Sequence, residues 1–387
     1  MIYKLRWSIL SILFLSLALF VYFTTHTLKK NNNLGQIEHQ AVSDCGKISD
    51  KKQCWEEKLE DILDKQGLNA GFDFVADLYE KEPEFAKDCH PYTHILGRYA
   101  YKKFYKRESI SIGPKTSYCG YGFYHGFMEA LIQDGRSPTE AKDFCSYIDN
   151  KSSGYTDKTI TACYHGIGHG TVDGGDPRFW GNANALISPS LDLCKQISDD
   201  DEIRYLCATG VFNSLAIALN FGQYNLKSSN NPYDSCYNLQ EDYFKRACYQ
   251  EMNTHALNLA KNDFSKAAGF LGMILEKKYA QFAMEQLAGA TIAYGNGDKD
   301  QYISTCKASI YEDACLWGLI GGILEHGKPN LEYVEAIEFC GNKSLSADAK
   351  DICYSRLVSV AGGLYPHEII NKICDLIPKQ HRKLCPN

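Results

Sequence analysis

The chain has 387 residues and a net charge of −6, with 41 basic residues interspersed among 47 acidic ones. This mixture excludes a polybasic surface, so we expect no nucleic-acid partner. Its 26 tyrosines and 18 phenylalanines supply enough apolar surface for a core, which excludes extended disorder beyond the first ~40 residues.

Residues 7–28 form an uncharged, strongly apolar run near the start of the sequence. A helix of this length crosses the ~30 Å hydrocarbon core of a bilayer. No small-residue cleavage site follows the run, which favours a retained signal anchor over a removed signal peptide. We therefore predict a cytoplasmic N-terminus at 1–6, a transmembrane helix at 7–28, a linker at 29–44 and an extracytoplasmic domain at 45–387.

The cysteines indicate the compartment. All 16 lie between Cys45 and Cys385, and none falls in the predicted anchor. An even, dense set on one side of a membrane helix is typical of disulfides formed in an oxidising compartment. Zinc ribbons would need repeated C-x2-C knuckles, and the sequence has none. The sequence therefore predicts a location in the periplasm, at the cell surface or in a secretory lumen.

Many of the cysteines open a similar amphipathic phrase, such as "CGYGFYHGFMEALIQDG" from Cys119 and "CLWGLIGGILEHGKPN" from Cys315. Successive phrases start 30 to 44 residues apart, except for an interval of 67 residues after Cys248. A copy without a cysteine, beginning at Phe282, fills that interval. Such a period, combined with ~3.6-residue periodicity, is typical of α-solenoids. We predict an all-α, disulfide-stapled α-solenoid of about ten helix-pair units of ~30–45 residues, behind the N-terminal transmembrane helix.

Most opening cysteines have another cysteine shortly upstream, and a disulfide between them would link the end of one helix to the start of the next. Closing a loop of ~10–20 residues stabilises a fold by about 3 kcal/mol in the chain-entropy model. By elimination, one pair bridges two neighbouring units. The predicted pairs are Cys45–Cys54, Cys89–Cys119, Cys145–Cys163, Cys194–Cys207, Cys236–Cys248, Cys306–Cys315, Cys340–Cys353 and Cys374–Cys385.

Glycines follow the same register. They stand three and seven residues after the opening cysteine, as Gly122 and Gly126 do after Cys119. Glycines four residues apart lie on one helix face and let another backbone approach closely. They also recur in units without histidine, as at Gly318 and Gly322, so we interpret them as packing residues.

The histidines do not follow the repeat, because five of the 11 fall in three consecutive units within residues 89–176. Four of them form two i, i+4 pairs, and such a pair can bind a transition metal in a bidentate manner. We predict that these five residues bind zinc, copper or iron, and that the last three converge first. The predicted ligands are His90, His94, His125, His165 and His169.

Two carboxylates extend the histidine stripe. Glu129 and Asp173 each stand four residues after a histidine and ten after the opening cysteine. A carboxylate at this position could ligate the metal or orient an imidazole. In a metal-dependent enzyme it could also act as general base toward an activated water. Both residues are therefore predicted catalytic residues.

A scaffold is the alternative to an extracytoplasmic metal-binding protein or metalloenzyme. The concave face of a solenoid commonly holds a peptide or a partner protein. Packed helices lie ~8–10 Å apart, so the first and third histidine units would be ~20 Å apart unless the array curls tightly. A scaffold nevertheless requires no clustering of imidazoles, and this clustering favours the metal site.

Overall fold

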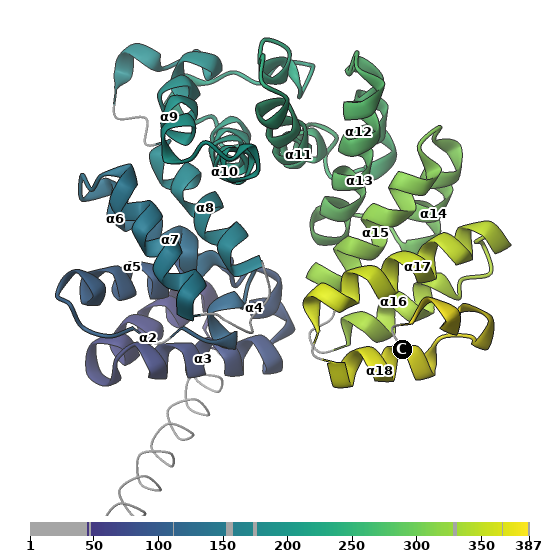
Figure 1. Cartoon of the computed structure of the whole chain (residues 1–387), viewed down its shortest axis with the longest axis horizontal. Coiled ribbons are helices and arrows are strands. Elements are labelled where there is room, and N and C mark those ends of the chain that lie inside the picture. The colour runs from purple at the N-terminus through teal and green to yellow at the C-terminus, as the bar shows by residue number, and fades with distance from the viewer. Residues whose placement is uncertain are drawn as a thin grey trace, which may run out of the picture. The chain divides into compact units, whose positions relative to one another are not determined.

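The structure is a computed structural model, and the part that it describes is all-helical, without a strand (Figure 1). Among these residues no helix combines the length and the apolar character needed to span a bilayer. The predicted anchor at 7–28 lies outside them. The described residues are 45, 48–110, 112–151, 158–172, 176–327, 331–365 and 367–385.

The α-helices alternate between longer and shorter elements along much of the sequence. They are α2 (Lys51–Gln66), α3 (Leu68–Lys81), α4 (Pro83–Lys87), α5 (His90–Tyr105), α6 (Gly122–Gln133), α7 (Pro138–Lys151), α8 (Lys158–Thr171), α9 (Ala183–Ile197), α10 (Asp201–Asn220), α11 (Asp242–Leu259), α12 (Phe264–Gly269), α13 (Lys277–Tyr294), α14 (Lys299–Ala308), α15 (Glu312–His326), α16 (Glu332–Cys340), α17 (Ala347–Leu364) and α18 (His367–Leu376). Short 3-10 helices occur at Pro114–Ser117, Pro177–Phe179, Gln223–Asn225, Asp234–Cys236, Phe270–Met273 and Lys379–Leu384.

The chain divides into two compact units, residues 1–78 and 79–387. In the first unit, the Asp50 side chain accepts a hydrogen bond from the Gln53 amide and so caps α2. Trp55 and Leu59 of α2 are buried. All predicted metal ligands lie in the second unit.

The second unit is organised around a helix row, in which α5, α6, α8, α10, α11, α13, α15 and α17 each pack against the next. Flanking helices cover this row: α7 packs on α8, α9 on α10, α14 on α15 and α16 on α17. Figure 1 shows this alternation most clearly from α13 to α17. The cysteine-free copy predicted from Phe282 lies within α13, which packs between α11 and α15.

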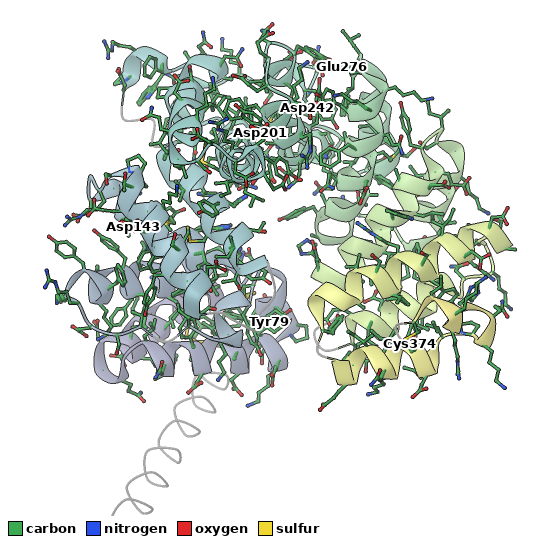
Figure 2. All side chains as sticks on the ribbon, in the orientation of Figure 1. Tyr79, Asp143, Asp201, Asp242, Glu276 and Cys374 are labelled. Atoms are coloured by element: carbon green, nitrogen blue, oxygen red, sulfur yellow. A yellow bond between two sulfur atoms is a disulfide. The ribbon has the colours of Figure 1, made fainter. Side chains whose placement is uncertain are left out.

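All eight predicted disulfides are present, and no cysteine is free. Most of them join a flanking element to the row helix that follows, as Cys194 of α9 joins Cys207 of α10. The last, Cys374–Cys385, anchors the end of the chain to α18 (Figure 2). Since eight disulfides form and persist under oxidising conditions, the fold belongs to an oxidising compartment.

Glycines let the row helices approach backbone to backbone, as predicted. A Cβ atom at Gly126 of α6 would overlap the His94 carbonyl of α5, and one at Gly210 of α10 would overlap the His165 carbonyl of α8. Gly170 of α8 lies so close to α6 that a Cβ would stand 3.0 Å from the Cα of Glu129. These contacts bring α5, α6, α8 and α10 closer together than helices with larger residues at the interface could be.

Candidate metal centre

The predicted ligands come from three consecutive helices of the row: His90 and His94 from α5, His125 from α6, and His165 and His169 from α8. The structure brings all five together. The ring centroids of His94 and His169 are only 5.9 Å apart, although they belong to the first and third of these helices. The imidazoles therefore converge although we expected the first and third units to be ~20 Å apart unless the array curls tightly. The glycine contacts help, because they bring the backbones of successive helices close together.

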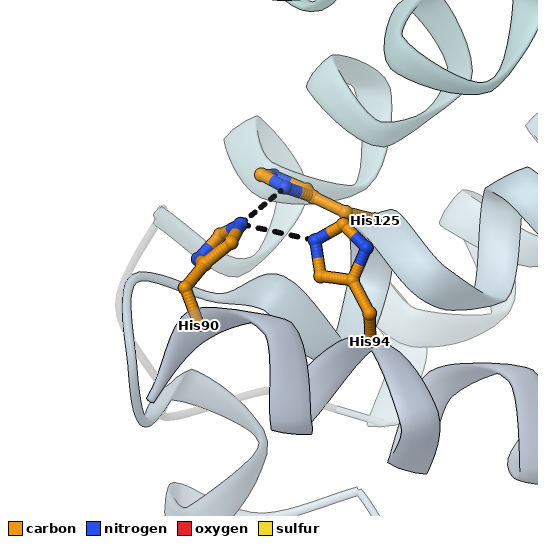
Figure 3. Close-up of side chains that lie close together, drawn as sticks. All are labelled: His90, His94 and His125. Carbon is orange, nitrogen blue, oxygen red and sulfur yellow. Dashed lines mark hydrogen bonds between the residues drawn. The ribbon is translucent and has the colours of Figure 1, made fainter. Parts of the chain in front are cut away.

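Three imidazoles form the tightest group. The Nε2 atom of His90 lies 3.0 Å from Nε2 of His94 and 3.2 Å from Nδ1 of His125 (Figure 3). Each of these residues offers one ligand atom, and the three atoms all lie within 4.8 Å of one another. This group differs from the trio that we expected to converge first, which was His125, His165 and His169. His90 joins it because the turn before α6 holds its ring toward His125.

The other two histidines lie beside this group. The His165 and His169 rings stack on His125, with centroids 4.7 Å and 5.4 Å away. His125 is therefore the centre of the cluster, and only 7 % of it is exposed.

Hydrogen bonds outside the cluster determine how two of the rings are protonated. The Nδ1 atom of His90 is 2.7 Å from the Cys119 carbonyl, which can only accept, so this nitrogen carries the proton. The Nδ1 atom of His165 is 2.8 Å from the Thr209 hydroxyl, whose own hydrogen goes to the Leu206 carbonyl. In the neutral form of both rings, Nε2 keeps a free lone pair.

Glu129 holds two further rings. Its Oε2 atom lies 3.1 Å from Nδ1 of His94, and its Oε1 atom lies 3.0 Å from Nδ1 of His169. Arg98 is more distant, with Nη1 3.7 Å from Oε2. Each imidazole thus donates Nδ1–H to the carboxylate and directs Nε2 away from it. A carboxylate that orients an imidazole in this way is common behind metal-ligating histidines.

Burial favours the neutral imidazole of three histidines in this cluster. Burial, together with the neighbouring histidines, lowers the pKa of His90 to about 4 and that of His165 to about 3. Burial also lowers the pKa of His125 well below its usual value. Neutral imidazole is the form that binds a metal. When neither is protonated at Nε2, His90 and His94 direct two lone pairs at each other across 3.0 Å, so a proton or a metal ion is needed between them.

Glu129 remains ionised in this environment. Burial alone would raise its pKa, but the hydrogen bonds from His169 and His94 outweigh burial and lower the pKa overall. Asp173, the other predicted carboxylate, lies outside the described residues, so its predicted role is untested.

Two polar residues of α10 belong to this neighbourhood but were not predicted. Thr209 holds His165, and Asn213 donates a hydrogen bond of 3.0 Å to Glu251 of α11. Burial raises the pKa of Glu251, and His169 is near enough to oppose this shift. Thr209 and Asn213 stand two and six residues after Cys207, which are the offsets of His165 and His169 after their own cysteine. The repeat register therefore indicates these two positions, although they carry threonine and asparagine where the preceding unit carries histidine.

Comparisons of the chain with protein-family models, with curated proteins and with solved structures find no match.

Proposed function

We propose that this protein binds a transition metal ion through Nε2 of His90, Nε2 of His94 and Nδ1 of His125. The observation that supports this most directly is the convergence of these three nitrogens, two of which are 3.0 Å and 3.2 Å from the third. With metal–nitrogen bonds of ~2.05 Å, these separations correspond to angles of ~94° and ~103° at the metal. Both angles suit neighbouring ligands of a tetrahedral or octahedral ion. An all-nitrogen set favours zinc, copper, iron or nickel over calcium or magnesium.

The surrounding hydrogen bonds support the proposal, because they orient the ligand rings before any metal arrives. The Cys119 carbonyl fixes His90 and Glu129 fixes His94. In this proposal Glu129 orients ligands, since a carboxylate with a lowered pKa is a poor general base near neutral pH. A general-base role for Glu129 or Asp173 remains the alternative.

The metal in this proposal is reactive and has no role in folding. Eight disulfides and the glycine contacts already hold the helices together. Three protein ligands also leave at least one coordination position open, as in catalytic rather than structural zinc sites. A water molecule there would become acidic enough to act as a nucleophile. His165 and His169 lie beside the triad and could contact such a water or complete the coordination.

We further propose that the helix row is part of an α-solenoid anchored to a membrane through residues 7–28. The domain would then face the periplasm, the cell surface or a secretory lumen. A peptide-binding scaffold remains the alternative function. The gathering of five imidazoles at one place favours the metal, because a peptide groove needs no such convergence.

Metal titration tests the proposal. The full-length chain, stripped of metal with a chelator, should bind about one equivalent of zinc. The double change His90→Ala, His94→Ala should weaken binding by more than 100-fold, since losing two ligands exceeds the 10–100-fold effect of losing an orienting group. His165→Ala, His169→Ala should weaken it less. The control is His326→Ala, a histidine of α15 outside the cluster. A wild-type chain that takes up no zinc, copper, iron or nickel would contradict the proposal.

A further inference from the structure

The disulfide beside the metal centre differs from most others in accessibility. Thirteen of the 16 cysteines are buried, whereas Cys119, Cys374 and Cys385 are half-buried. Among the eight disulfides, Cys89–Cys119 and Cys374–Cys385 are therefore the two with a half-cystine that is not fully buried. Since thiol–disulfide exchange requires access to a sulfur atom, these are the two candidates for attack from solution.

Cys89–Cys119 is also asymmetric. Its half-buried cysteine, Cys119, lies in the turn before α6, whereas its buried cysteine, Cys89, is the N-cap residue of α5. The N-terminus of a helix stabilises a thiolate, and a stabilised thiolate leaves more readily in exchange. If Cys89 is released, its thiol lies 3.4 Å from the Ala86 carbonyl, which could accept its hydrogen. Cys119, the more accessible residue, is thus suited to being attacked, and buried Cys89 to leaving.

The same disulfide is coupled to a metal ligand. His90 directly follows Cys89, and its Nδ1–H donates to the carbonyl of Cys119, at 2.7 Å. The turn that presents this carbonyl contains three consecutive left-handed residues, Cys119, Gly120 and Tyr121, with φ of 57°, 65° and 61°. Two of them are not glycine, and such residues rarely adopt this conformation unless surrounding structure imposes it. Cleaving the disulfide therefore removes a constraint from the turn and, with it, from the partner of His90.

We propose that Cys89–Cys119 is a site of thiol–disulfide exchange with an external dithiol, and that its reduction loosens His90 and weakens metal binding. The second half of this proposal rests on the proposed metal centre. In the first step a thiolate of the dithiol bonds to Sγ of Cys119, while Cys89 leaves with the electron pair of the broken S–S bond and takes a proton from water. The second thiol then attacks the mixed disulfide and releases Cys119. The protein disulfide gains two electrons, and the dithiol is oxidised to its disulfide.

The exchange site can be tested without metal. The full-length chain would be treated with limiting dithiothreitol, quenched with iodoacetamide and mapped by mass spectrometry; in parallel, reduced glutathione would trap the mixed disulfide. We expect Cys89 and Cys119 to be alkylated before the cysteines of the six disulfides in which both residues are buried. We also expect glutathione on Cys119. Prior reduction of a disulfide such as Cys194–Cys207, or glutathione on Cys89, would overturn the assignment.

The coupling needs a matched pair of variants. Zinc affinity would be measured by competition with a chromophoric chelator for Cys89→Ser, Cys119→Ser and for Cys374→Ser, Cys385→Ser, which removes the other accessible disulfide. The first pair should weaken zinc binding by about 10–100-fold, the range for losing an orienting partner, and the second should leave it unchanged. Equal zinc affinity in the Cys89→Ser, Cys119→Ser double variant and the wild type would overturn the coupling. A wild type that binds no metal would instead contradict the proposed function, while the trapping result would still decide the exchange site.

Discussion

Two regions of the helix row are packed in the same way but carry different chemistry. In the early region, Gly170 of α8 packs on the backbone of Glu129; in the late region, Gly318 of α15 packs on the carbonyl of Glu285 of α13. Each glycine thus brings a helix against a half-buried glutamate. Glu129 contacts two imidazoles, whereas Glu285 forms an ion pair of 2.7 Å with Arg356 of α17, whose guanidinium lies 4.8 Å from the Trp317 ring.

The difference shows that packing and chemistry are separable in this fold. Arginine has no lone pair to offer a metal, so the late region satisfies its carboxylate internally. Histidine can donate one N–H to the carboxylate and keep the lone pair of its other nitrogen for a metal. The same backbone arrangement therefore gives an ion pair in one region and a set of converging imidazole nitrogens in the other.

Replacing the two glutamates tests this contrast with the largest expected effect. Glu129→Gln should weaken zinc binding by about 10–100-fold, because the amide holds the His94 and His169 rings less firmly. Glu285→Gln should leave zinc affinity unchanged. Competition titration measures both. Unchanged affinity in Glu129→Gln would show that the histidine cluster does not depend on its own carboxylate, and equal losses in both variants would show that the effect is not specific to the cluster.

Replacing the glycines tests the shared packing. Gly126→Ala and Gly318→Ala should each lower the free energy of unfolding by about 1–3 kcal/mol, as overpacking typically does. The added Cβ overlaps a carbonyl oxygen of the preceding row helix, and this overlap outweighs alanine's better helix propensity. Urea denaturation with disulfides intact measures the change. Only Gly126→Ala should also weaken zinc binding, so metal loss in Gly318→Ala would contradict the separation of the two regions.

The pH dependence of stability should have opposite signs for the two carboxylates in the metal-free chain. The pKa of Glu129 is lowered in the folded state, so its stabilisation is present above its ordinary value of 4.5 and is lost as the pH falls below it. Burial raises the pKa of Glu285 despite Arg356, so its contribution is most favourable below 4.5 and declines as the pH rises. Glu129→Gln should therefore reduce the acid sensitivity of unfolding, and Glu285→Gln should increase it. Urea midpoints between pH 3 and 7 check both signs; matching slopes would show that the two sites do not differ.

The smallest effect is expected from the residue that holds His165. Thr209→Val removes a hydrogen bond worth about 1 kcal/mol, which corresponds to roughly a fivefold loss of zinc affinity. Thr291→Val is the matched control, since the Thr291 hydroxyl likewise bonds to a carbonyl of its own helix but lies in α13. No difference between the two variants would indicate that His165 contributes nothing to metal binding.

The disulfide pairing and the helical fold could be predicted because both are encoded locally. Each cysteine pairs with its neighbour in the sequence, and the glycines repeat at fixed offsets from Cys119, Cys163 and Cys315. The register also places His125 and His169 at the same offset on successive row helices, which accounts for part of the predicted gathering of the five histidines.

The membership of the tightest triad could not be predicted in the same way. His90 stands at an offset that no other histidine shares, and its position depends on the Cys119 carbonyl, a contact across 29 residues. Average helix spacing also does not include the close backbone approach at Gly126 and Gly170, which only the structure reveals. Thr209 shares the offset of His165 from its opening cysteine, but a threonine at that offset carries no metal-ligand signal of its own.

The pairing order of the disulfides has a consequence for biosynthesis. Every bond joins two cysteines that are consecutive in the sequence, from Cys45–Cys54 to Cys374–Cys385. Sixteen cysteines could pair in about two million ways, yet when residues 45–387 enter an oxidising compartment in sequence order, each cysteine meets its correct partner next. An oxidase that simply joins each new thiol to the last unpaired one would produce the native set. We therefore expect maturation to require a disulfide oxidase but little help from a disulfide isomerase.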